Sequence, residues 1–150
     1  MEIEVDQSYK VEHTNRPTAL AFFSPGVSRS LLIPAKVKQN ALRYLKDSGR
    51  KGHRSVQFLF AAAVFLLIEK DLAQITYIWI DIEYQGHEND IRLVLLNLVR
   101  ADRPDFSSKQ IGFRLIGKKS GAHLLALAVQ RGSTQPDRTV TLKDILTLRG

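Results

Sequence analysis

The stretch 76–90, TYIWIDIEYQGHEND, constrains the fold most, because an apolar strand turns within it into a polar helix start. Strand side chains alternate between faces, so the isoleucines share one face, while Asp81 and Glu83 share the other. A buried carboxylate is stable only when it is paired, protonated or bound to a metal. Binding sites of open α/β sheets gather at the carboxyl ends of strands. The stretch therefore predicts a central strand over 77–84 that ends at a functional site.

A turn at Gly86 leads from this strand into a predicted helix over 87–100. His87 and Glu88 stand at the start of that helix, beside the two strand acids, and are additional candidates for the site. A structural explanation stays open, because an acid at a helix N-terminus also interacts favourably with the helix dipole.

The rest of the chain predicts four further strands and three further helices. The strands are expected at 2–13, 18–23, 28–34 and 110–117, and the helices at 36–46, 55–72 and 122–130. Short turns join the first three strands into an antiparallel meander. The later elements alternate, which gives parallel strands with right-handed crossovers. We therefore expect an α/β protein with a mixed five-stranded sheet, flanked by helices.

Local signals set several details of these elements. Ser55 and Ser120 are expected to cap the second and last of these helices. The second helix is apolar nearly all round, and Trp79 is expected to lie in the core with it. Residues 1–131 form the predicted domain, and 132–150 a polar linker with a short amphipathic helix that packs on it; the capping pattern Thr141-x-x-Asp144 starts this helix. Leucines on one face of that helix make a second copy of the chain a candidate partner.

Charge points to a polyanionic partner. The net charge is +7 and the pI about 9.9, which favours nucleic acid, although a basic protein without such a partner stays an alternative. A basic loop and a basic stretch near the last helix supply the candidate phosphate contacts: Arg50, Lys51, Arg54, Arg114, Lys118 and Lys119.

Other function classes are excluded by what the sequence lacks. There is no cysteine, which excludes disulfides, thiolate zinc sites and cysteine nucleophiles, and there is no phosphate-binding loop motif. The longest apolar run, 56–68, is interrupted only by Gln57 and is too short to span a bilayer, so no membrane partner is expected. The acidic N-terminus resembles no targeting peptide, and a cytoplasmic location is expected.

Three features carry a resemblance to a known family. The first strand contains Asp6-Gln7-Ser8, the fourth strand ends in Asp81 and Glu83, and His123 stands near the start of the last helix. With the order of elements, these features make residues 1–131 resemble the RNase H-like fold of ribonucleases H, integrases and Holliday-junction resolvases. In that family the fourth strand lies parallel beside the first, and their acids share a site.

The resemblance implies a metal-dependent nuclease, or a related phosphodiester-processing enzyme, that uses Mg²⁺ or Mn²⁺. Asp6 would bridge the metals, and Asp81 or Glu83 would complete the site. His123 would either bind a metal or orient the attacking water. A shared metal site requires the Asp6 and Asp81 carboxylates to lie about 4–6 Å apart.

Two other functions stay open. The predicted helix over 122–130 contains no Asp or Glu, which favours a non-catalytic nucleic-acid-binding or regulatory protein with this fold. Alternatively, the acids pair internally with Arg92, Arg114 or Lys119, and the chain is a structural or assembly module. The sequence leaves DNA and RNA, and single and double strands, equally open.

Overall fold

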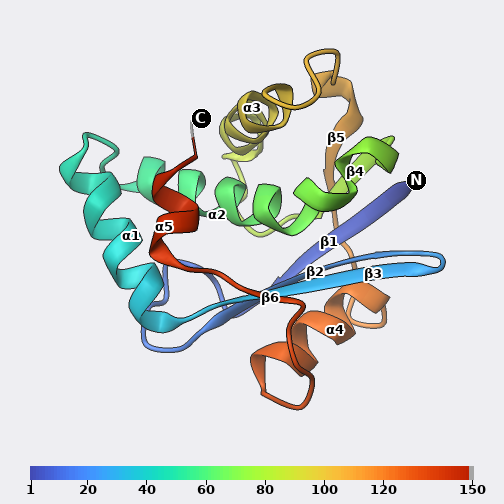
Figure 1. Ribbon diagram of the computed structural model, residues 1–150, viewed down its shortest axis with the longest axis horizontal. Coiled ribbons are helices and arrows are strands. Elements are labelled where there is room, and N and C mark those ends of the chain that lie inside the picture. The colour runs from blue at the N-terminus through green and yellow to red at the C-terminus, as the bar shows by residue number, and fades with distance from the viewer. Residues whose placement is uncertain (149–150) are drawn as a thin grey trace.

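The computed structural model describes residues 1–148, and residues 149–150 of the predicted C-terminal segment lie outside this range. A mixed sheet with helices on both faces makes up the fold (Figure 1). In chain order the elements are β1 (Glu2–Ser8), β2 (Thr18–Ser24), β3 (Val27–Ile33), α1 (Ala35–Asp47), α2 (His53–Ile68), β4 (Tyr77–Asp81), α3 (Glu88–Arg100), β5 (Ile111–Arg114), α4 (Gly121–Gln130), β6 (Arg138–Thr139) and α5 (Leu142–Leu146). A short 3₁₀ segment at Glu69–Gln74 follows α2, and another at Ser108–Gln110 precedes β5.

The sheet has the strand order β5-β4-β1-β2-β3-β6. The predicted α/β class is confirmed, with antiparallel β1-β2-β3 and with β4 and β5 parallel to β1. The predicted count of five strands is wrong, because Arg138 and Thr139 pair parallel with β3 as a sixth strand. Two residues are too few to show strand alternation in the sequence, and their partner is distant along the chain.

The register between β1 and β4 brings the acids of the two strands to one level. Glu4 pairs with Trp79 and Val5 with Ile80, so the next residues in this register are Asp6 and Asp81. Because the strands are parallel, both carboxylates lie at the carboxyl end of the sheet and on the same face.

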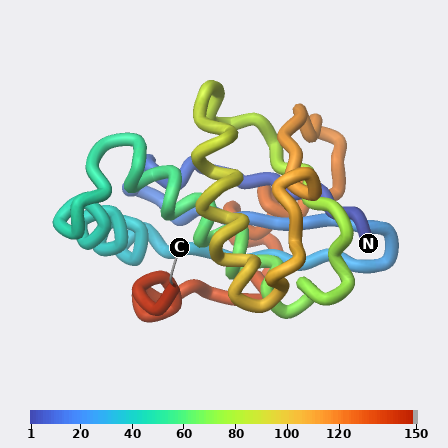
Figure 2. Tube along the Cα trace, turned by 90° about the horizontal axis from the view of Figure 1, so that it is seen from above, coloured from blue at the N-terminus to red at the C-terminus, as the bar shows by residue number. Residues whose placement is uncertain are grey.

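Helices cover the two faces of the sheet unequally. Helices α2 and α3 lie on one side of the sheet and α4 on the other (Figures 1 and 2). Residues Phe58–Ile68 of α2 are all buried, as its nearly continuous apolar sequence predicts. Helix α4 packs mainly on β1, β2 and β3, and α5 packs on α1 and α2. No helix within residues 1–148 has the length and apolar character needed to cross a membrane.

Several predicted boundaries are corrected. Strand β1 ends at Ser8 and does not reach 13, since Tyr9 has a positive φ of 68° that turns the chain. Helix α2 begins at His53, so Ser55 lies within its first turn and is not its cap; its Oγ donates to the Gly52 carbonyl oxygen at 2.8 Å. The caps predicted at Ser120 and Thr141 are confirmed.

Candidate metal centre

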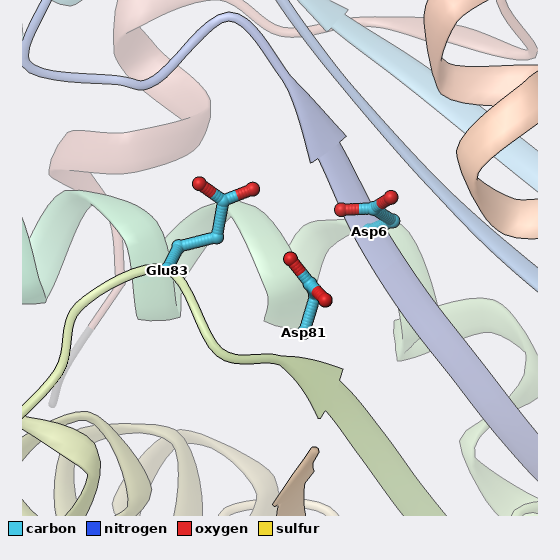
Figure 3. A group of neighbouring side chains, drawn as sticks. All are labelled: Asp6, Asp81 and Glu83. Atoms are coloured by element: carbon cyan, nitrogen blue, oxygen red, sulfur yellow. The ribbon is translucent and has the colours of Figure 1, made fainter. Parts of the chain in front are cut away.

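Three carboxylates converge at the carboxyl ends of β1 and β4 (Figure 3). Asp6, Asp81 and Glu83 each offer an oxygen, and these oxygens all lie within 4.8 Å of one another. Asp6 is buried, whereas the other two are half-buried. The structure thus places together the three residues that the sequence singled out as metal ligands.

Each carboxylate is held by a different part of the fold. Asp6 extends from β1, and its Oδ1 accepts a hydrogen bond from the main-chain N–H of Gln7 at 2.8 Å. Asp81 is the last residue of β4, and its Oδ1 accepts from the Ile116 N–H at 2.8 Å, which ties it to the loop before α4. Glu83 lies past the end of β4 rather than on it, so the predicted strand over 77–84 is too long.

Burial and mutual repulsion disfavour the charged forms of Asp6 and Glu83. Burial raises the pKa of Asp6, and the neighbouring Asp81 carboxylate raises it further. Burial also raises the pKa of Glu83 to about 7, with added contributions from Asp81 and Asp6. Carboxylates this close are stable together only when protons or cations intervene. Bound protons or a cation would therefore relieve the repulsion within the cluster.

His123 belongs to α4, which lies on the other side of the sheet from α2, and its side chain contacts the cluster from that side. Its Nδ1 lies 3.0 Å from Oδ2 of Asp6, and its side chain is 28% exposed. The side chain of Ser120 accepts a hydrogen bond from the His123 N–H at 3.1 Å, which fixes the first turn of α4. The helix cap therefore determines where the imidazole meets the sheet.

A hydrogen-bond network that the sequence did not reveal supports the loop after β4. Tyr84 accepts from Nε2 of Gln7 and donates to Glu12, both at 3.0 Å, and burial raises the pKa of its hydroxyl. Gln7 is buried, and its Oε1 has no hydrogen-bond partner in the described part of the chain. In the sequence Gln7 stands next to Asp6, but no pattern indicates that Tyr84 is its hydrogen-bond partner.

The basic residues near α4 differ in whether other side chains hold them in place. Arg114 pairs with Glu4 at 2.9 Å, and its guanidinium lies 4.2 Å from the Trp79 ring centre. Trp79 is only half-buried and lies outside the core, so the prediction of a core tryptophan is wrong. Lys118 and Lys119 are exposed in the turn before α4.

The remaining candidates lie apart from the carboxylates. Arg50, Lys51 and Arg54 surround the start of α2, where Arg50 and Arg54 line a hollow together with His87. The carboxylate of Glu88 accepts hydrogen bonds from the Gly86 N–H at 3.1 and 3.3 Å. Glu88 thus closes its own turn and stands outside the cluster.

Comparison of the chain with protein-family models, curated proteins and solved structures finds no match in any of the three.

Proposed function

We propose that the chain is a metal-dependent nuclease with an RNase H-like fold. The observation that carries this proposal is the convergence of Asp6, Asp81 and Glu83 within 4.8 Å at the carboxyl ends of two adjacent parallel strands. The pairing of β4 beside β1 is the arrangement that the resemblance implies. The net charge of +7 suits a polyanionic substrate.

The donor set fits a hard divalent cation. All three groups offer carboxylate oxygens, which are the ligands that Mg²⁺ and Mn²⁺ prefer. Burial raises the pKa of Asp6 and of Glu83, and repulsion from the neighbouring carboxylates raises both further; a cation would offset these costs. When bound, such an ion would stabilise the attacking and leaving oxygens of a phosphodiester.

His123 is placed to handle a proton beside this cluster. In the neutral ring, an Nδ1–H that donates to the Asp6 carboxylate leaves Nε2 as an acceptor. A base held in this way can take a proton from a water that attacks phosphorus. Lys118 and Lys119 lie in the turn just before His123 and would hold substrate phosphates there.

A cleavage assay tests the proposal. Labelled single-stranded and duplex DNA and RNA are incubated with Mn²⁺ or Mg²⁺ at pH 8, and the products are resolved by size. We expect metal-dependent cleavage that Asp81→Asn abolishes. Glu88→Gln is the matched control, because this carboxylate at the start of α3 lies outside the cluster. Cleavage that survives chelation, or that Asp81→Asn leaves unchanged, would refute the proposal.

One observation favours a second candidate function, a nucleic-acid-binding protein without catalysis. Helix α4 contributes His123 but no carboxylate, so the cluster holds three acids. In that case the protein would bind Mn²⁺ and nucleic acid but would cut no substrate under any of these conditions.

A further inference from the structure

A second hollow, separate from the carboxylate cluster, lies between the N-terminal halves of α2 and α3. Its volume is about 550 Å³. Its polar lining comes mostly from cationic or imidazole side chains: Arg50, His53 and Arg54 on the α2 side, and His87 on the α3 side. Asp90 is the one acid among the lining residues within 1–148. We call this hollow the basic groove.

The charge around the basic groove is unfavourable for the protein alone. Arg50, Lys51 and Arg54 stand at the N-terminus of α2, where the helix dipole already places partial positive charge. Within the described residues, no side chain caps this end of α2, and its first turn contains no acid. Cations gathered here reduce stability, and an anion in the groove would offset that repulsion.

Contacts with neighbouring side chains hold His53, His87 and Arg50 in the groove. The rings of His53 and His87 stack with centres 4.8 Å apart and planes 28° apart. Gln57 is only 7% exposed, and its Nε2 lies 3.0 Å from Nδ1 of His87. Because an amide nitrogen donates, Nδ1 accepts and the neutral ring carries its proton on Nε2. Arg50 is also anchored, with its guanidinium 4.3 Å from the Phe58 ring centre.

The groove is close to the carboxylates along the chain. His87 follows Glu83 by four residues, and four residues span at most about 14 Å when fully extended. Phosphates of one strand in a duplex are spaced about 3.4 Å along the helix axis. A strand that lies across the cluster would therefore place a phosphate near His87, on the α3 side of the groove, within about four nucleotides.

We propose that the basic groove binds the phosphodiester backbone of a nucleic-acid strand, within about four nucleotides of the bond that lies at the carboxylate cluster. The proposal rests on the proposed function for the position of the scissile bond. The binding itself requires no metal and no catalysis. Arg50 and Arg54 supply charge, and His87 supplies an Nε2–H donor to the same strand.

Binding in the absence of metal tests this proposal. Fluorescence anisotropy measures the affinity for a labelled 20-nucleotide DNA, as a single strand and as a duplex, in EDTA over a series of salt concentrations. We expect Arg54→Gln to weaken binding about fivefold to tenfold, and to reduce the slope of log affinity against log salt by about 1. Lys143→Gln is the matched control, because Lys143 is an exposed cation on α5. It should leave the slope unchanged.

The possible outcomes distinguish the groove proposal from the nuclease proposal. If Arg54→Gln reduces the affinity and the slope while the wild type cuts no substrate, the groove stands and the nuclease proposal fails. If the wild type cuts nucleic acid but Arg54→Gln and Lys143→Gln bind alike, the groove proposal is overturned.

A second measurement tests whether the groove binds a small anion instead of a nucleic-acid strand. Proton NMR follows the ring signals of His53 and His87 during titration with inorganic phosphate and then with the oligonucleotide. The oligonucleotide should shift both rings at lower concentration than phosphate does. Shifts with inorganic phosphate alone would assign the groove to a small anion and overturn the strand-binding proposal.

Discussion

The carboxylate of Glu83 should destabilise the folded protein above neutral pH, and removal of its charge should reverse this effect. Burial, together with Asp81 and Asp6, raises the pKa of Glu83 from 4.5 to about 7. Between these pH values the folded chain holds a proton that the unfolded chain has already released. The free energy of unfolding therefore falls as the pH rises from 4.5 to 7, and the full cost is present above pH 7.

The magnitude follows from the two pKa values. A difference of about 2.5 corresponds to about 3 kcal/mol, because one pKa unit is worth about 1.4 kcal/mol. Because the Glu83 side chain is half-buried, solvent screening reduces this figure to about 1–2 kcal/mol. Glu83→Gln preserves the shape of the side chain and removes its charge. It should raise the free energy of unfolding by about 1–2 kcal/mol at pH 8, and by much less at pH 5.

Urea unfolding at pH 5 and pH 8, with EDTA present, measures this difference. Asp105→Asn serves as the control, because Asp105 is an exposed carboxylate in the turn after α3 and should change stability little at either pH. If Glu83→Gln lowers stability at pH 8, or raises it equally at both pH values, then the charge of Glu83 does not lower the free energy of unfolding above neutral pH.

Three further changes probe the frame around the site. Gly112→Ala should lower the free energy of unfolding by about 1–3 kcal/mol in urea, because the new Cβ would lie 2.7 Å from Cζ3 of Trp79. Ser120→Ala should lower it by about 1 kcal/mol, since it removes the cap that holds the His123 turn, and Ser120→Thr should retain most of the stability. Burial lowers the pKa of Lys38 from 10.5 to about 8, so the folded chain releases this proton before the unfolded chain does. The free energy of unfolding should therefore rise between pH 8 and 10.5, and Lys38→Met should remove that rise in a pH series of urea unfolding.

Local patterns in the sequence predicted the elements that bring the carboxylates together. Strand alternation assigned Asp81 to one face, and the resemblance to the RNase H-like fold implied that the fourth strand lies parallel beside the first. These two inferences are enough to bring Asp81 beside Asp6, as the register of β1 and β4 shows. The caps at Ser120 and Thr141 were equally predictable, because each depends on residues within one turn.

Features that depend on distant neighbours could not be predicted in this way. Trp79 has the apolar character of a core residue, but α4 covers mainly β1, β2 and β3, so this side chain stays half-exposed. The sixth strand forms because Arg138 and Thr139 meet β3 across the fold. The contact of His87 with Gln57 likewise joins two helices whose lateral packing no local pattern encodes.

Calorimetric titration with Mn²⁺ at pH 8 tests the central claim most directly. The wild-type protein should bind Mn²⁺ with a saturable heat, and Asp81→Asn should abolish the binding or weaken it at least tenfold, because it removes one of three converging carboxylates. Equal Mn²⁺ binding by the wild type and Asp81→Asn, or no binding by either, would contradict the assignment of Asp6, Asp81 and Glu83 as a metal centre.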